Sequence, residues 1–320
     1  MGKISCKGRL DPQMAAALQK QVELVPPSAD LAQLPLADIR QMYNHERRFW
    51  NADAPPMETI ENHTVDGPCG AVPVRLYFPS PQRPLPGLIY LHGGGWVVGN
   101  LDTHDKIMRL LALRSGAAVV GVDYHLAPEH RFPTQLDEVL AVLAHIRRRG
   151  NAWGLVPSRL ALGGDSAGAN MSLSIAVSLR DQTPDPLKAL LLFYGAFGLR
   201  DSGSRRLYGS LEDGMRKEDL DFYIKCYLND SADEDSLRFD VFRADLSRLP
   251  FTYIGAAEYD PLVDDSVTLQ RCLAEVGVPH TLHLYQGVLH GFLHLSRMVD
   301  KASQAIDDAA GVLREQLLVR

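Results

Sequence analysis

The pentapeptide Gly164-Asp165-Ser166-Ala167-Gly168 decides the fold of this 320-residue chain. It fits the pattern G-x-S-x-G, which this composition would produce by chance about 0.1 times, so its context matters. The apolar stretch Leu160–Leu162 precedes the pentapeptide, and residues 167–180, which predict a helix of small side chains, follow it. Glycines at both ends permit a sharp turn between strand and helix. The pattern therefore predicts Ser166 as an exposed nucleophile at that turn.

Outward from this turn, short apolar stretches alternate with longer amphipathic ones. The stretches that predict buried strands are Pro86–Leu91, Ala117–Val122, Leu160–Leu162, Ala189–Tyr194, Thr252–Ala256 and Thr281–Tyr285. The helical patterns between them lie near 104–115, 134–149, 167–180 and 265–276. Such alternation predicts an α/β fold, with a mostly parallel central sheet and helices on both of its faces.

Two segments stand outside the alternation. Residues 1–50 contain the helical patterns Pro12–Leu24 and Leu36–Trp50, and residues 199–245 contain a third at Lys217–Leu228. Open α/β sheets place their sites at the carboxyl ends of the strands, and long insertions are often functional. We expect residues 1–50 to form N-terminal cap helices. Residues 51–320 then form the catalytic domain, with a cap insertion near 199–245; surface decoration is the alternative.

A second glycine-rich motif, His92-Gly93-Gly94-Gly95-Trp96, follows the predicted strand Pro86–Leu91. Chance would produce HGGG on the order of 0.01 times at this composition. Glycines leave backbone N–H groups open to a developing oxyanion, and the residue after the nucleophile supplies another donor. We predict an oxyanion hole among Gly93, Gly94, Gly95 and Ala167. A phosphate-binding loop fits less well, because neither GK[ST] nor G-x-G-x-x-G spacing is present.

A serine nucleophile needs a base, and in this chain order the histidine comes last. The histidines that follow Ser166 are His280, His283, His290 and His294. The first two flank or lie within the last predicted strand, where packing or surface roles are usual. His294 is expected to begin the final helix. His290 lies in a loop directly after that strand, so we predict it as the base.

The acid of the triad should follow the strand Thr252–Ala256. The candidates there are Glu258, Asp260, Asp264 and Asp265. Pro261 disfavours helical geometry at Asp260 and keeps it in the turn. Asp264 is better placed as the N-cap of the next helix, and Glu258 as a member of a buried polar network. We therefore predict Asp260 as the acid.

Aromatic residues close to these motifs are candidates for the substrate pocket. Trp96, Tyr194 and Phe197 are expected to line it, and Phe49 with Trp50 to close it from above. Phe193 fits the core better. A capped site rimmed by aromatic rings predicts short acyl groups, from acetyl to hexanoyl.

Composition narrows the function classes further. The net charge is −6, the densest basic run is Arg147–Arg149, and there is no run of 18 apolar residues. Neither nucleic acid nor a membrane is therefore an expected partner. The four cysteines form no CxxC pair, so neither a disulfide framework nor a zinc site is expected. The N-terminus lacks a signal-peptide pattern, which predicts a cytoplasmic protein.

These motifs together resemble the hormone-sensitive-lipase family of α/β-hydrolases, the bacterial type IV esterases. The resemblance extends from about residue 70 to the C-terminus and is carried by HGGGW, by residues 123–130 with Phe132-Pro133, and by GDSAGAN, EYDPL and His290-Gly291-Phe292. It implies an α/β-hydrolase fold, the triad Ser166, Asp260 and His290, and the oxyanion donors named above. Residues 46–52, 99–105 and 198–202 look like those of enterobacterial acetyl esterases. Ala169 and Gly195 depart from the family pattern, which has glycine and proline there.

The resemblance implies hydrolysis of a small-molecule ester through an acyl-enzyme, without metal or cofactor. A regulatory or binding protein on a hydrolase scaffold is an alternative, because fold alone does not fix function. Hydrolysis of amides by the same triad is another. The sequence leaves open a homodimer, a regulatory protein partner and the natural substrate.

Overall fold

The computed structural model describes residues 3–26, 31–180, 187–210 and 214–318. Among these residues, eight strands form one sheet in the order β1-β2-β4-β3-β5-β6-β7-β8. Their bounds are β1 Thr59–Gly67, β2 Gly70–Phe78, β3 Leu85–Leu91, β4 Ala118–Val122, β5 Leu155–Asp165, β6 Ala189–Phe193, β7 Phe251–Tyr259 and β8 His280–Leu289. The strands from β4 to β8 in this order are parallel, and β2 runs antiparallel to both β1 and β4. The predicted, mostly parallel sheet is thus confirmed.

The hairpin of β1 and β2 was absent from the prediction. Its strands meet in register from Thr59 opposite Phe78 to Gly67 opposite Gly70. β1 is polar and lies at the edge of the sheet, where Val65 is its only buried residue, so it lacks the apolar stretch that marks the buried strands. β5 is also longer than predicted, because its polar first half still pairs with β3 at Leu85–Leu155.

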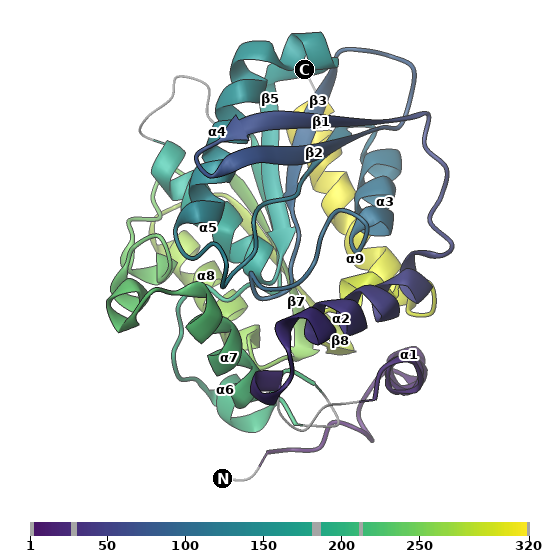
Figure 1. The fold of residues 1–320 in the computed structure, drawn as a ribbon, viewed down its shortest axis with the longest axis vertical. Helices are drawn as coiled ribbons and strands as arrows, with labels where there is room; N and C mark the ends of the chain where they lie inside the picture. Colours follow the sequence, from purple (N-terminus) through teal and green to yellow (C-terminus); the bar gives the residue numbers. More distant parts are fainter. Residues whose placement is uncertain (1–2, 27–30, 181–186, 211–213, 319–320) are drawn as a thin grey trace.

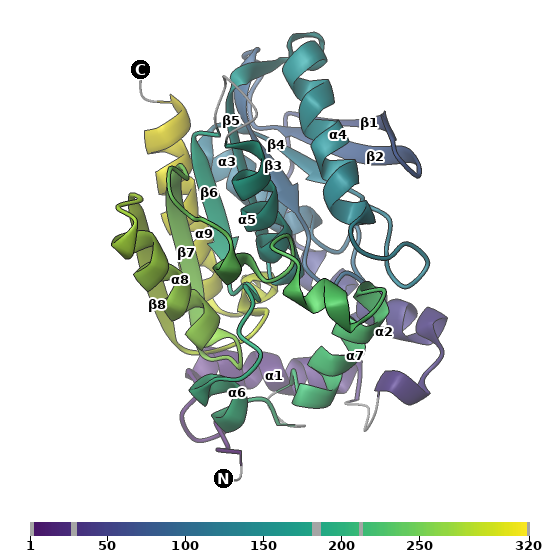
Figure 2. The same cartoon turned by 90° about the vertical axis from the view of Figure 1, so that its left-hand side faces the viewer.

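Helices cover both faces of the sheet (Figures 1 and 2). On one face α3 packs against α9, and on the other α4, α5 and α8 contact the strands. Strand side chains alternate between two cores, so that Leu88 and Tyr90 join the α3–α9 side while Ile89 and Leu91 join the opposite side. The bounds of these helices are α3 Asp105–Ser115, α4 Thr134–Arg149, α5 Ala167–Leu179, α8 Val263–Glu275 and α9 Asp300–Leu313.

The helices outside the alternation gather at one end of the molecule (Figures 1 and 2). They are α1 Pro12–Leu24, α2 Leu36–Asn51, α6 Gly203–Leu207 and α7 Lys217–Tyr227. We refer to these four helices as the cap. Local signals explain α1, since Asp11 accepts a hydrogen bond from the Gln13 N–H and Pro12 occupies the first turn.

Arg40 fastens α2 to the loops beneath it. Its Nε donates to the carbonyl of Val97 at 2.9 Å, and one Nη donates to the carbonyl of Ala127 at 3.0 Å. The same guanidinium forms an ion pair with Glu129 at 2.7 Å. The cap therefore contacts the chain directly after the HGGGW motif.

Two predictions about the ends of elements were wrong. His294 lies in a 3-10 helix, Phe292–Leu295, and the final helix begins only at Asp300. Asp264 lies inside the first turn of α8, whose N-cap is Leu262, and its carboxylate accepts from the Ser204 N–H of the cap. In both places a tertiary contact replaces the local signal.

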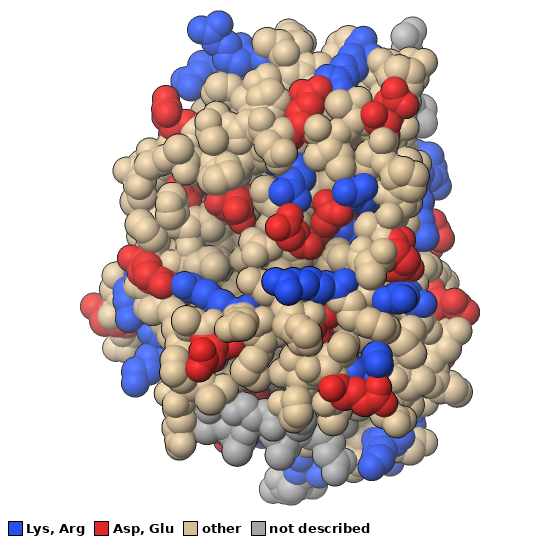
Figure 3. Space-filling view, turned by 45° about the vertical axis from the view of Figure 1, so that its right-hand side comes forward, with Lys and Arg blue, Asp and Glu red and all other residues tan. Residues whose placement is uncertain are grey.

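Basic and acidic side chains alternate over the face shown in Figure 3, with no large area of one sign. Among the described residues, no helix combines the length and apolar character needed to cross a membrane.

Candidate active site

The turn that contains Ser166 joins β5 to α5. Ser166 has φ 52° and ψ −116°, in the left-handed region that non-glycine residues rarely occupy. Its N–H donates to the Phe193 carbonyl at 2.8 Å. A Cβ atom at Gly164 or Gly168 would lie 2.2 or 2.0 Å from the carbonyl oxygen of Leu91. Both glycines are therefore needed for the close approach of β3 that holds the strained serine in place.

Ser166, His290 and Asp260 are brought together at the ends of three strands. His290 Nε2 lies 3.0 Å from Ser166 Oγ, and His290 Nδ1 lies 2.7 Å from Asp260 Oδ2. Asp260 is fully buried, and its other oxygen accepts from the Leu262 N–H at 2.8 Å. This geometry is that of a nucleophile, a base and an orienting carboxylate in series.

The other acid candidates have different partners. Glu258 is half-buried and accepts from the Gly287 N–H at 2.7 Å. Asp265 is buried, and its Oδ1 accepts from three backbone N–H groups of residues 197–199 at 2.8–3.2 Å. The turn that follows β6 is thus held by Asp265, a role that the sequence did not reveal.

The other histidine candidates contact groups other than Ser166 Oγ. The ring of His280 bonds the Val278 carbonyl at 2.7 Å, and His283 contacts Asp308 at 3.0 Å. His294 lines the same cavity as Ser166 but faces Asp165, at 3.8 Å.

The glycine loop differs from the prediction at its first residue. The Gly93 N–H donates to Asp165 Oδ1 at 3.0 Å, so it anchors the loop and is not free for substrate. Gly94, Gly95 and Ala167 line the cavity beside Ser166. Ala167 is the first residue of α5, where N–H groups have no partner within the helix. These three residues are therefore the remaining candidates for the oxyanion hole.

A buried polar network lies under this loop. Tyr90 donates to Asp165 Oδ1 at 2.9 Å, and His104 Nε2 is 3.3 Å from the same oxygen. Burial alone would raise the pKa of Asp165, but His104 and these hydrogen bonds hold it below its usual value. Burial lowers the pKa of His92 to about 3. Burial, and then the charge of Arg47, lowers the pKa of His294 well below its usual value.

The same network contains groups of metal-ligand type. Within the described residues, one such cluster consists of His104, Asp165 and His294, whose ligand atoms lie within 4.8 Å of one another. Asp165 already accepts from Gly93 and Tyr90, and this commits its carboxylate to the loop. These residues are far apart in the sequence, so their spacing gave no signal for the cluster. That the chain needs no metal or cofactor stays a prediction.

The cavity around Ser166 has a volume of about 1110 Å³. Trp96 and Tyr194 line it as predicted, but Phe197 does not: its side chain is fully buried, with its ring 6.3 Å from that of Phe242. Phe49 and Trp50 do not line it either. Trp50 is buried and donates to Glu46.

Two other residues of α2, Tyr43 and Arg47, line the cavity in place of Phe49 and Trp50. They are four residues apart and so share one face of the helix. The prediction chose Phe49 and Trp50 without regard to this helical face.

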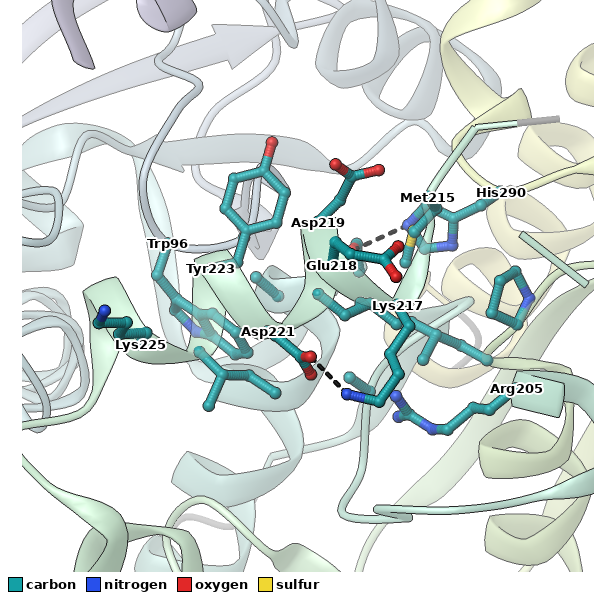
Figure 4. A pocket seen from close by; sticks show the side chains of 18 of the residues that line it. Trp96, Arg205, Met215, Lys217, Glu218, Asp219, Asp221, Tyr223, Lys225 and His290 are labelled. Atoms are coloured by element: carbon teal, nitrogen blue, oxygen red, sulfur yellow. Dashed lines mark hydrogen bonds and ion pairs between the residues drawn. The ribbon is translucent and has the colours of Figure 1, made fainter. Parts of the chain in front are cut away.

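α7 forms an aromatic wall over the glycine loop. The ring of Trp96 stacks on Tyr227 at 4.3 Å with an interplanar angle of 4°. A Cβ atom at Gly95 would meet the ring of Tyr223 at 2.4 Å, so this ring rests on the loop. Figure 4 shows Trp96 and Tyr223 on one side of the cavity and His290 on the other. Helical spacing of Tyr223 and Tyr227 was the signal that could have identified this wall.

Comparison with known proteins gives a consistent set of relatives. Residues 88–294 match a family described as having the α/β-hydrolase fold. An acetyl esterase of Salmonella choleraesuis strain SC-B67 is 44% identical over 311 residues, which cover 96% of this chain and 95% of that protein. A hyperthermophilic esterase of Pyrobaculum calidifontis superposes with a TM-score of 0.92 at 29% identity, over 97% of this chain and 100% of that one. An α/β hydrolase from the metagenome of Lake Arreo, Spain, superposes with a TM-score of 0.91 at 32% identity, over 98% and 100%.

Proposed function

Since this chain belongs to the α/β-hydrolase fold family, among the serine esterases related to hormone-sensitive lipase, we propose that it hydrolyses esters of short acyl groups, from acetyl to hexanoyl. The reaction class is carboxylic ester hydrolysis, and the substrate is a small-molecule ester. In this proposal Ser166, His290 and Asp260 form the catalytic triad, and the reaction passes through an acyl-enzyme.

The observation that carries the proposal is the unbroken hydrogen-bond series from Ser166 Oγ through His290 to Asp260, at 3.0 and 2.7 Å. In this role Asp260 accepts the Nδ1–H of His290, which leaves Nε2 unprotonated toward the serine. His290 Nε2 can then take the serine proton as Oγ attacks the ester carbonyl.

The oxyanion that forms is stabilised by the N–H groups of Gly94, Gly95 and Ala167. When the bond from the carbonyl carbon to the alcohol oxygen breaks, His290 returns the proton to the leaving alcohol. Water then attacks the acyl-serine, His290 takes a proton from it, and the carboxylic acid leaves as Ser166 recovers its proton.

The wall formed by Trp96, Tyr223 and Tyr227 supports the short acyl range. Each added methylene gains at most ~0.8 kcal/mol by burial while space remains. Once the chain meets this wall, overpacking costs ~1–3 kcal/mol and reverses the trend. The joined triad gives no support to the non-catalytic alternative, and no contact favours amides over esters. A homodimer, a regulatory partner and a cytoplasmic location stay predictions.

The variant Ser166→Ala tests the nucleophile. It should lower kcat by about a million-fold, because a triad acts as a unit. Hydrolysis of p-nitrophenyl acetate by the purified variant measures this, and a thermal melt verifies the fold. Ser178→Ala, whose hydroxyl bonds the Ser174 carbonyl within α5, is the matched control and should retain activity. Residual activity above about a hundredth of the original would mean that another residue is the nucleophile.

A further inference from the structure

One wall of the cavity carries buried polar groups that the triad chemistry does not use. Arg47 of α2 and Tyr194, directly after β6, both line the cavity that contains Ser166 and His290. Tyr194 is 1% exposed, and the Arg47 side chain is 11% exposed. Within the described part of the chain, neither the Tyr194 hydroxyl nor the Arg47 Nε has a hydrogen-bond partner. Because buried polar groups are nearly always paired, these two call for an explanation.

Arg47 is held rigidly from the cap side. One Nη donates to Glu46 at 2.5 Å, and the guanidinium carbon lies 4.5 Å from the centre of the Tyr43 ring. Glu46 is itself buried and accepts hydrogen bonds from Gln21 and Trp50. The guanidinium is thus anchored by Glu46 and by a hydrogen bond to the Tyr43 side chain, while its Nε has no partner among the described residues.

Tyr194 is held equally firmly from the sheet side. Its φ of 39° is in the left-handed region, a strain that persists only where the surroundings impose it. Its N–H donates to the Gly255 carbonyl at 2.7 Å, and its ring lies 4.8 Å from that of His290 at 64°. Burial raises the pKa of Tyr194 well above its usual value, so the hydroxyl keeps its proton and can donate it.

The polar wall lies on the side of the leaving alcohol. The catalytic histidine hands its proton to the alcohol oxygen, so the alcohol must leave beside His290, against which Tyr194 packs. Arg47 lines the same cavity as Tyr194, His290 and His294. Trp96 and Tyr223 lie across the cavity from His290 (Figure 4), on the side left for the acyl group.

We propose that Arg47 and Tyr194 form a subsite for the leaving alcohol that binds an oxygen atom of it, so that the preferred substrates are short-chain esters of polyhydroxylated alcohols. This inference rests on the proposed ester hydrolysis at Ser166. A hydroxyl oxygen can accept from Arg47 and either accept from or donate to Tyr194. The cavity of about 1110 Å³ is slightly larger than the roughly 300–1,000 Å³ of sites that hold drug-sized ligands, so it has room for such an alcohol beside a small acyl group.

Two acetates of nearly equal shape test the subsite, 2-hydroxyethyl acetate and n-propyl acetate, which differ by a hydroxyl in place of a methyl group. The readout is the ratio of their kcat/KM values, divided by the ratio of their rates of hydroxide-catalysed hydrolysis. For the wild type we expect a value well above one. It should fall about tenfold in Arg47→Lys, because an ammonium group cannot reproduce the fixed donor geometry of the planar guanidinium. It should fall about fivefold in Tyr194→Phe, which removes the hydroxyl.

The variants are chosen to preserve the surroundings. Lysine keeps a positive charge beside Glu46, and phenylalanine keeps the ring against His290. Arg48→Lys is the matched control, since Arg48 is the exposed neighbour on the same helix, and its ratio should equal that of the wild type.

A wild-type value of one or below, an unchanged ratio in either variant, or an equal fall in Arg48→Lys would overturn the subsite while leaving ester hydrolysis intact. Failure of the wild type to hydrolyse either acetate would instead overturn the proposed function.

Discussion

The strand ends that carry Ser166, Asp260 and His290 and the cap that covers them are built on different principles. The three triad residues each follow a strand of one sheet, and the order β5-β6-β7-β8 sets those strand ends side by side. The cap combines helices from two distant parts of the sequence: α1 and α2 precede β1, whereas α6 and α7 lie between β6 and β7. Several of its ion pairs are exposed, such as Lys217–Asp221, with side chains 72% and 56% accessible.

This difference separates chemistry from selectivity. Exposed ion pairs contribute at most about 1 kcal/mol, so these positions of the cap can vary at little cost to stability. The Asp260–His290 contact is buried and tied to the backbone, so small displacements there cost far more. We expect substitutions at the strand ends to abolish turnover, and substitutions in the cap to change which ester is preferred.

After Ser166→Ala, the largest expected effect comes from Asp260→Asn. The amide stabilises the wrong tautomer of His290, and kcat should fall by about 10⁴-fold. Glu258→Gln and Asp264→Asn are matched controls, because these carboxylates bind backbone N–H groups outside the triad. Their kcat values for p-nitrophenyl acetate should stay within a few-fold of the wild type. Equal losses in the three variants would show that the triad acid has been misassigned.

Gly94→Ala should have the next largest effect. Gly94 has φ 117°, and a Cβ there would lie 2.2 Å from the Val98 carbonyl oxygen, so the loop must shift. Loss of one oxyanion donor typically lowers kcat by about 10²–10³-fold. Gly70→Ala, at a glycine with φ 131° but open surroundings, is the control for strain alone. If both variants lose activity equally, Gly94 is not part of the oxyanion hole.

The same contrast explains what the sequence could predict. The positions of Ser166, Asp260 and His290 at the strand ends were predictable because a strand and a turn, both local patterns, place each of them. Six strands and the helices Pro12–Leu24 and Thr134–Arg149 were predictable for the same reason. Their contact with one another could be predicted from one further assumption, that the three strands belong to the same sheet.

What failed depended on contacts between distant segments. Phe197 faces the core because Asp265 fixes the backbone of its turn, and no local signal reports that bond. The Gly93 N–H donates to the carboxylate of Asp165, which lies far away in the sequence. The polar strand β1 is defined by its partner β2 more than by its own composition.

A change of pH should alter the stability of the protein through two buried imidazoles in the strand-end region, those of His92 and His294. The pKa of His92 is lowered to about 3, and that of His294 is also lowered, while the unfolded value is about 6.5. Below pH 6.5 the unfolded state therefore binds more protons than the folded state, so stability falls as the pH falls. Each histidine contributes about 1.4 kcal/mol per pH unit in that range.

Urea unfolding at pH 7.5 and pH 5.5 measures this loss of stability. His294→Gln should reduce the difference between the two conditions, whereas His45→Gln, at an exposed position of α2, should not. An equal difference in wild type and His294→Gln would show that this imidazole does not contribute.

The smallest expected effect lies in the cap, where Tyr223 should limit acyl length. Its ring rests on Gly95 and closes the side of the cavity opposite His290 (Figure 4). With p-nitrophenyl esters, the wild-type kcat/KM should peak between acetate and hexanoate and collapse by laurate. A wild-type maximum at laurate or palmitate would make the enzyme lipase-like and would refute the short-chain proposal.

Tyr223→Ala removes the ring that ends this pocket, so the optimum should move toward longer acyl groups. Each methylene that enters the new space can raise kcat/KM by about fourfold at most, which corresponds to ~0.8 kcal/mol of burial. Phe222→Ala is the matched control, because Phe222 is the adjacent residue of α7 and does not line the cavity. The triad is untouched in both variants, so acetate hydrolysis should change less than hydrolysis of the longer esters. If the acyl-length optimum shifts equally in both variants, the shift comes from a displacement of α7 and not from the Tyr223 ring. If the optimum does not shift in Tyr223→Ala, the acyl group binds elsewhere in the cavity.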